Sequence, residues 1–308
     1  MHIGIYISAR PTRTLDEIVA AIRSAEGEGL HTAWLGQLFD YDALTVLAVA
    51  GATTSRIELG TWVVPSYPRH PSSLALQALS VQAASANRLL LGVGVSHKVV
   101  IEGRLGLDYS KPLGHAKEYL AVLDGLLSGE RLDHKGEHYQ VRLSLDIPPG
   151  ALPPKVLLAA LGPQMLRLAG RAADGAAIWL GSPRYLEEFA IPRVQASAQE
   201  VGRPAPRIVC GLPIAISNDV SAARSAVAAV VDPSAALPSY RAVLERGGAT
   251  LPSDVAVLGN ERQVRDQLEQ LARIGVTDFN ALVIPVKEDP KAYARTRSFL
   301  SEFARDRD

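Results

Sequence analysis

The sequence predicts an α/β protein of the (β/α)8-barrel class, folded as a single domain over residues 1–308. Short β-rich runs alternate with longer segments of helical period, which is the pattern of a parallel sheet built from βα units. Eight such runs are present, and eight is the strand number of this barrel. Hydrophobic residues make up 47% of the chain and charged residues 21%, so a large core can form.

The expected strands lie between segments with helical spacing. They span residues 3–8, 32–36, 57–64, 88–93, 156–160, 176–180, 208–216 and 278–284. The helices are expected to begin at Leu15, Ala43, Ser72, His115, Pro163, Arg184, Ala222 and Pro290, with a further helix over 261–274. Thr14 and Glu17 have the spacing of a capping box before the first helix. Gly29 and Gly275 stand where a helix should end before the next strand.

Two segments interrupt the alternation. Residues 131–141, with Lys135 and Gly136 at the centre, predict a small β-hairpin inserted before the fifth barrel strand. Residues 232–253, rich in Ala, Pro and Gly, predict a helical excursion after the seventh strand. Neither segment has the character of a domain linker.

Charge and targeting features exclude several function classes. Lys and Arg total 32, as do Asp and Glu, so no net positive field favours nucleic acid or an anionic membrane. The sequence shows no secretory leader and no window of about 18 apolar residues. The single cysteine, Cys210, lies in an apolar run and is expected to be a buried, inert thiol. We expect a soluble, cytoplasmic protein without nucleic-acid or membrane partners.

The common enzyme signatures are absent, including the phosphate-binding loop, the zinc-protease HExxH pattern and the hydrolase GxSxG elbow. His134 and His138 are four residues apart, but they flank the expected hairpin turn. We therefore interpret them as solvated surface histidines and predict no metal site.

In a barrel of this class the chemistry takes place at the carboxyl ends of the strands. The turn at Gly162 opens a helix and suits an anion such as a cofactor phosphate, although many ordinary βα turns have the same composition. His97, just after the fourth strand, could exchange a proton near neutral pH or simply hydrogen-bond a neighbouring loop. Trp62 and Trp179 could form a wall for a planar ring or belong to the core.

Three long motifs, in order, carry a resemblance to a known family. They are the segments LGTWVVPSYPRHP at residues 59–71, ASANRLLLGVG at 84–94, and LAALGPQMLRLAG at 158–170, the last followed by Ala173-Asp174-Gly175. The chain is thereby identified as similar, over its whole length, to the luciferase-like flavin and deazaflavin oxidoreductases. Residues 94–97 and 67–71 most resemble the subgroup that uses the deazaflavin coenzyme F420.

The resemblance implies hydride transfer between C5 of the deazaflavin and an organic small-molecule substrate. It implies a non-proline cis peptide at Thr61–Trp62, backing the cofactor ring. It also leaves His97, which stands where related enzymes carry an acidic residue, as the expected catalytic acid or base. The implied cofactor-binding residues are Gln37, Thr61, Trp62, Val63, Ser96, His97, Leu161, Gly162, Pro163, Gln164 and Met165.

The chain departs from related sugar-phosphate and alcohol dehydrogenases at two places. Their Asp-His pair after the second strand is replaced by Gln37 and Leu38, and their acidic residue after the fourth strand corresponds to His97. These departures favour reduction of an activated C=C or C=N bond by reduced F420 over alcohol oxidation. The alternatives are an FMN-dependent monooxygenase that uses oxygen and a flavin-binding barrel without activity. Family members commonly pair, so a homodimer is also expected.

Overall fold

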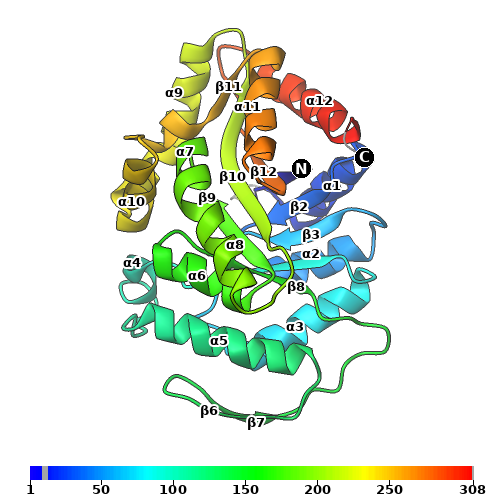
Figure 1. The fold of residues 1–308 in the computed structure, drawn as a ribbon. Helices are drawn as coiled ribbons and strands as arrows, with labels where there is room; N and C mark the ends of the chain where they lie inside the picture. The colour runs from blue at the N-terminus through cyan, green and yellow to red at the C-terminus, as the bar shows by residue number, and fades with distance from the viewer. Residues whose placement is uncertain (9–12, 307–308) are drawn as a thin grey trace.

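The computed structural model describes residues 1–8 and 13–306, and in this part of the chain a parallel sheet closes into an eight-stranded barrel (Figure 1). Strand β1 pairs with β12 on one side and β2 on the other, and β9 pairs with β10 to complete the ring. The barrel strands are β1 (His2–Ile7), β2 (Thr32–Leu35), β3 (Glu58–Thr61), β5 (Leu89–Gly94), β8 (Lys155–Ala159), β9 (Gly175–Trp179), β10 (Arg207–Ile216) and β12 (Asp278–Val283). The predicted fold class is confirmed.

Helices surround the barrel and bury its outer face (Figure 1). The longer ones are α1 (Leu15–Gly27), α2 (Ala43–Gly51), α3 (Pro71–Ala84), α5 (Pro112–Leu127), α6 (Pro163–Ala172), α8 (Ile191–Gln199), α9 (Val220–Val231), α10 (Pro238–Arg246), α11 (Glu261–Arg273) and α12 (Ala292–Arg305). The capping box at Thr14 and Glu17 forms as predicted. A short α7 (Pro183–Tyr185) widens into a π-helical turn, Leu186–Ala190, before α8. Pro192, near the start of α8, has no N–H to donate, and this missing hydrogen bond explains why the turn before α8 is π-helical and not α-helical.

The inside of the barrel is a packed layer, because alternate residues of each strand point inward. Trp34 on β2 is fully buried there among Leu90, Leu157 and Val209. Its ring fills the position that a side chain on β3 would take: a Cβ added to Gly60 would lie 2.1 Å from the Trp34 ring. The centre of the barrel is therefore filled by side chains.

The inserted hairpin is present as β6 (Leu132–Lys135) and β7 (Gln140–Leu143). It lies along α5, where the Glu118 carboxylate accepts hydrogen bonds from three backbone N–H groups at residues 137–139. His134 and His138 are half-buried on the side facing α5, with His134 Nε2 3.5 Å from Glu118. The expectation of solvated surface histidines was therefore wrong, because the hairpin packs against a helix instead of projecting into water.

The excursion after β10 is helical, as predicted, and consists of α9, a 3₁₀ turn (Asp232–Ala236), α10 and a second 3₁₀ turn (Pro252–Val255). It is followed by a short strand that the sequence did not predict, β11 (Val257–Gly259), which extends the sheet alongside the end of β10. Among the described residues no helix has both the length and the apolar character needed to span a membrane.

Candidate active site at the barrel mouth

The third barrel strand is interrupted where it reaches the mouth. Strand β3 ends at Thr61, the Trp62–Val63 peptide is cis, and the chain resumes pairing as β4 (Val64–Pro65). The predicted cis bond was therefore placed one residue too early. The N–H of Trp62 still donates to Leu35 across the sheet, at 2.8 Å, so regular pairing continues through Trp62 and the chain turns only after it.

The glycines of the LGVG motif make room for this interruption. A Cβ on Gly92 would lie 2.2 Å from the Thr61 carbonyl oxygen, and one on Gly94 would lie 2.9 Å from the Val63 side chain. The Thr61 side chain is fully buried, and its hydroxyl donates to the Gly92 carbonyl at 2.7 Å. Thr61 thus fixes the bulge against β5, and Val63, which is only half-buried, stands nearer the mouth.

Aromatic rings form the floor of the mouth. Trp62 packs edge-on against Trp34 below it, with ring centroids 5.4 Å apart, and against Trp179 at the end of β9, 6.4 Å away. Gly211 on β10 leaves the space that both upper rings need, since an added Cβ would lie 2.6 Å from Trp62 and 2.7 Å from Trp179. Both tryptophans are half-buried and pack on the core, and their use as a wall for a planar ring stays a prediction.

His97 lies at the end of β5, on the rim of the mouth. Ser96 before it has a left-handed backbone (φ 60°), which is uncommon for a residue with a side chain, and its carbonyl accepts a hydrogen bond from the Tyr109 hydroxyl at 2.9 Å. The imidazole of His97 meets hydroxyl groups of Ser239 and Tyr240 on α10. Burial lowers the pKa of His97 below its ordinary value.

The turn after β8 has the features expected of an anion site. Gly162 is the N-cap of α6 and Pro163 its first residue, and no side chain in the described chain caps this helix. A Cβ on Gly162 would meet no described atom within 4 Å, so the approach to the helix start is open. Gln164 is exposed, and Leu161 and Met165 are half-buried. The backbone N–H groups of the first turn therefore face accessible space.

Gln37 is half-buried at the end of β2, where its side-chain oxygen lies 3.4 Å from the Ala43 N–H at the start of α2. The two residues that follow it, Leu38 and Phe39, are 49% and 60% exposed. Gln37 is thus placed at the mouth but is held by a neighbouring helix, and the apolar residues beside it offer no proton-transfer group.

The remaining residues of the motif after β4 support the mouth from behind. Tyr67 stacks on the buried His115 ring with centroids 3.8 Å apart, and the Ser66 hydroxyl lies 2.9 Å from His115 Nε2. Burial, together with nearby His138, lowers the pKa of His115 to about 4, so this ring is neutral. His70 caps α3 by accepting from the Ser72 N–H at 3.2 Å. His115 and His70 thus have structural hydrogen-bond partners, whereas the buried Tyr67 hydroxyl has none among the described residues.

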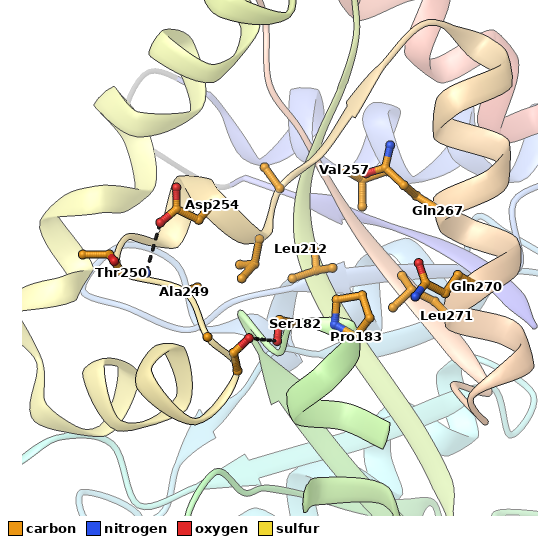
Figure 2. Close-up of a pocket in the computed structure, with 14 residues that line it drawn as sticks. Ser182, Pro183, Leu212, Ala249, Thr250, Asp254, Val257, Gln267, Gln270 and Leu271 are labelled. Atoms are coloured by element: carbon orange, nitrogen blue, oxygen red, sulfur yellow. Dashed lines mark hydrogen bonds between the residues drawn. The ribbon is translucent and has the colours of Figure 1, made fainter. Parts of the chain in front are cut away.

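A cavity of about 350 Å³ lies elsewhere, on the outer side of the barrel wall (Figure 2). A Cβ added to Gly211 would point into the barrel, toward the tryptophans. Side chains alternate along a strand, so that of the next residue, Leu212, points outward and lines this cavity. The other lining residues come from the start of α7, from α11 and from the chain between them: Ser182, Pro183, residues 247–250, residues 254–257, Gln267, Gln270 and Leu271. The cavity is separate from His97 and the floor of the mouth.

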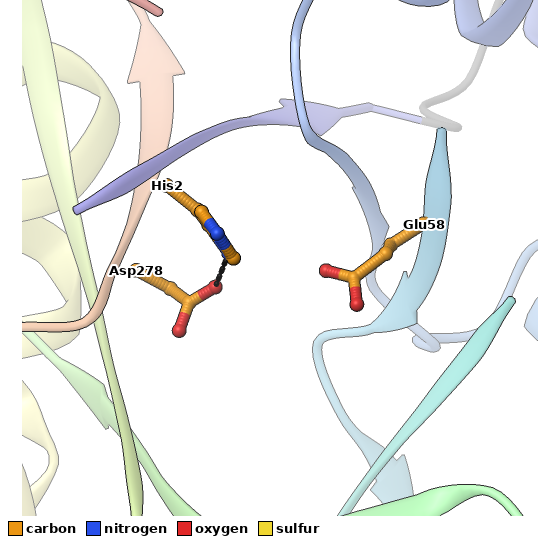
Figure 3. Close-up of side chains that lie close together, drawn as sticks. All are labelled: His2, Glu58 and Asp278. Atoms are coloured by element: carbon orange, nitrogen blue, oxygen red, sulfur yellow. Dashed lines mark ion pairs between the residues drawn. The ribbon is translucent and has the colours of Figure 1, made fainter. Parts of the chain in front are cut away.

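The opposite end of the barrel carries a cluster with metal-ligand chemistry, formed by His2, Glu58 and Asp278 (Figure 3). Arg207 on β10 lies among them and donates two hydrogen bonds to Glu58, at 2.9 and 2.8 Å, and a 3.1 Å bond to Asp278. Burial alone would raise the pKa of Asp278, but hydrogen bonds from His2 and Arg207, with the guanidinium charge, hold it well below its ordinary value. The guanidinium thus supplies the positive charge that these carboxylates require, and the cluster is an ion-pair network.

The fold and the mouth together define a (β/α)8-barrel protein with a titratable group and an open helix start at the carboxyl end of its strands. The chain belongs to the luciferase-like monooxygenase family, whose model matches residues 1–278.

The chain is similar along most of its length to several relatives and solved structures. A putative coenzyme F420-dependent oxidoreductase from Mycobacterium tuberculosis is 31% identical over 312 residues, covering 92% of this chain and 85% of the relative. The 5,10-methylenetetrahydromethanopterin reductase of Methanolobus tindarius is 29% identical over 226 residues, covering 72% and 67%. The solved coenzyme F420-dependent tetrahydromethanopterin reductase from Methanopyrus kandleri superimposes with a TM-score of 0.82 at 22% identity, covering 97% and 96%. This last likeness establishes the fold.

Proposed function

We propose that this protein is an F420-dependent oxidoreductase that reduces an activated C=C or C=N bond of an organic substrate. The observation that carries the proposal is the mouth itself: a break in the third strand between β3 and β4 over an aromatic floor, with His97 after the neighbouring strand β5 and an open helix start after the next strand, β8. The likeness to the mycobacterial F420-dependent relative over 92% of the chain supports the choice of cofactor. When bound, the deazaflavin supplies hydride at C5.

The residues present fit such a cofactor. Leu161, Gly162, Pro163, Gln164 and Met165 would hold its phosphate, because a helix start without a cap offers free N–H groups and positive potential. The open approach above Gly162 leaves room for that group.

The ring side of the cofactor has suitable neighbours as well. Trp62 and Val63 would back the ring, with Gln37 and Ser96 at its edges and Thr61 contributing only backbone. Aromatic and aliphatic surface on one side and a few polar groups at the rim are what a planar, partly polar ring needs.

His97 would protonate the substrate atom that becomes anionic as hydride arrives. Its pKa is depressed by burial, so the free protein holds a neutral imidazole at pH 7. Negative charge developing on an adjacent substrate atom favours the imidazolium, so the ring takes up a second proton from solvent, passes it to that substrate atom and returns to the neutral form. Two alternatives stay open to test: an FMN-dependent monooxygenase, and a flavin-binding barrel without activity. We also propose that the protein is a homodimer.

One set of experiments separates these functions. The purified protein is titrated with F420 and, separately, with FMN, and then oxidation of reduced F420 is followed by absorbance with a panel of enones and imines. The proposal expects F420 to bind more tightly than FMN and at least one acceptor to be reduced without oxygen. Preference for FMN with oxygen-dependent turnover would establish the monooxygenase instead. Tight F420 binding without turnover on any acceptor would favour the inactive barrel.

The proposed phosphate site has a direct test in Gln164→Glu. A carboxylate in the first turn of α6 repels a phosphate at the N–H groups, so the dissociation constant for F420 should rise about tenfold or more, on the order of 1.4 kcal/mol. A negative charge near the N-terminus of a helix interacts favourably with the helix dipole and stabilises the helix, so weaker binding would not reflect a damaged fold.

Isothermal titration measures the change, with Gln199→Glu as the control. Gln199 is exposed at the far end of α8, and its charge should leave the affinity within about twofold. Equal affinities for wild type and Gln164→Glu would place the phosphate elsewhere.

A further inference from the structure

Both ring nitrogens of His97 meet hydroxyl groups on α10. Nε2 lies 3.3 Å from the Tyr240 hydroxyl, and Nδ1 lies 3.4 Å from the Ser239 hydroxyl. The Tyr240 ring packs edge-on against the imidazole, with centroids 5.1 Å apart and an interplanar angle of 70°. Two consecutive residues, more than 140 positions along the chain from His97, thus hold its ring from both sides.

The helix that carries these hydroxyls is fixed in place over the rim. The Ser182 hydroxyl, just after β9, donates to the Gly247 carbonyl at the end of α10 at 3.1 Å. A Cβ on Gly247 would lie 2.2 Å from that hydroxyl, so only glycine permits this approach. At its other end α10 begins with Pro238, which suits the first turn of a helix. The position of α10, and with it the contact between α10 and His97, is therefore fixed by the segment that follows β10.

We propose that Tyr240, assisted by Ser239, is a positioning residue that fixes the orientation of the His97 ring and selects the nitrogen that carries its proton. The inference rests on the proposed function, in which His97 is the proton donor. A neutral imidazole has one N–H and one bare nitrogen, and a hydroxyl can accept from the first or donate to the second. Two hydroxyls therefore satisfy both atoms at once.

The surroundings of His97 keep this arrangement neutral. Burial raises the pKa of Tyr240 to about 12, so its hydroxyl stays protonated across the working pH range. The nearest charged residues on the His97 loop, Lys98 and Glu102, pair with each other at 3.2 Å. The Tyr109 hydroxyl donates to the Ser96 carbonyl.

The long hydrogen bonds suit a group that must change partner. At 3.3 and 3.4 Å they lie near the upper limit for hydrogen bonds, as catalytic contacts often do before substrate binds. A substrate atom can replace one hydroxyl while the other continues to hold the ring. Helix α10 therefore contributes to proton transfer through these two hydroxyls, in addition to forming a wall of the mouth.

The test is Tyr240→Phe, which keeps the ring packing and removes only the hydroxyl. In protein labelled with ¹⁵N-histidine and studied without cofactor, the wild-type His97 ring should show one dominant tautomer, with its signals assigned by comparison with His97→Gln. Tyr240→Phe should give a mixture of tautomers. In turnover of reduced F420, kcat should fall about tenfold with KM changed less than threefold. Ser239→Ala, at the more exposed contact, should produce the same changes in smaller measure.

Tyr119→Phe is the matched control, since it removes a buried tyrosine hydroxyl on α5 that has no hydrogen-bond partner among the described residues. It should leave the His97 signals and kcat unchanged. His97 signals that are identical in wild type, Tyr240→Phe and Ser239→Ala would overturn the positioning role, whatever the activity. If the wild-type protein does not turn over F420 but Tyr240→Phe still shifts the His97 tautomers, the positioning role is supported and the proposed function is rejected.

Discussion

In His97→Ala, kcat for reduction of the organic substrate should fall by about 10²–10⁴, the usual contribution of general acid–base catalysis. The dissociation constant for F420 should change only a few-fold, because the phosphate and ring contacts proposed above do not depend on the imidazole. Single-turnover kinetics and a separate cofactor titration measure the two quantities. A near-normal kcat, or a loss of affinity that accounts for the whole loss of activity, would give the proton-donor role to Ser96, a bound water or the substrate itself.

The pH dependence gives the same assignment a second measurement. Burial lowers the pKa of His97 below its ordinary value near 6.5. If the protonated form is required, kcat/KM in the reductive direction is highest below that pKa. It should then fall as pH rises, approaching tenfold per pH unit above it. His97→Gln should remove this limb of the profile. A wild-type profile that is flat between pH 5 and 8 would argue against proton donation by His97.

Arg207→Met should lower the free energy of unfolding by about 3–5 kcal/mol at pH 7, because it leaves a buried carboxylate without its main partner. Asp278 is 2% exposed and Arg207 14% exposed, so water can replace little of the lost interaction. Urea denaturation followed by circular dichroism measures the change. The matched control is Arg171→Met, whose partner Glu200 lies on the surface and whose loss should cost less than about 1 kcal/mol.

The sign of the pH effect follows from the depressed pKa of Asp278. The stability that this carboxylate contributes is present above its unfolded pKa, about 3.9, and is lost as pH falls through the lower folded value. In Arg207→Met the buried carboxyl is instead easier to protonate. The difference in the free energy of unfolding between wild type and Arg207→Met should therefore become smaller as pH is lowered towards 4. Adding Asp278→Asn to the variant should restore part of the stability. A loss below 1 kcal/mol at pH 7 would contradict the role of this network.

Local pattern was enough to predict most of the fold. The eight barrel strands follow from runs that alternate with helical segments, the hairpin at β6–β7 from the turn at its centre, and the excursion from its composition. Strand β11 was missed because three residues are too few to show a period. The cis peptide of the third strand was predicted one residue too early, because the exact point where pairing stops depends on the Leu35 carbonyl of the adjacent strand.

The site could be predicted only in part. Position after a strand placed His97 and Gly162 at the mouth, since every strand end of a parallel barrel lies at the same rim. The contact between His97 and Tyr240 joins residues 143 apart, and no local pattern encodes it. The sequence predicted the excursion over residues 232–253 but not which of its side chains contacts the histidine. Likewise, the sequence around Thr61 does not show that its hydroxyl donates a hydrogen bond to the Gly92 carbonyl.

The pairing of β1 with β12 has a consequence for how the chain avoids aggregation. His2 pairs with Asp278, so the ring is complete only after segments from distant parts of the chain have met, which makes closure a non-local step. Until then β1 and β12 are free sheet edges, and their exposed N–H and C=O groups can pair with another chain. Strand β1, with the sequence HIGIYI, contains no proline and no acidic residue to discourage such pairing. Substitutions that slow closure should therefore appear first as loss of soluble protein during expression, before any defect is seen in the folded molecules that remain.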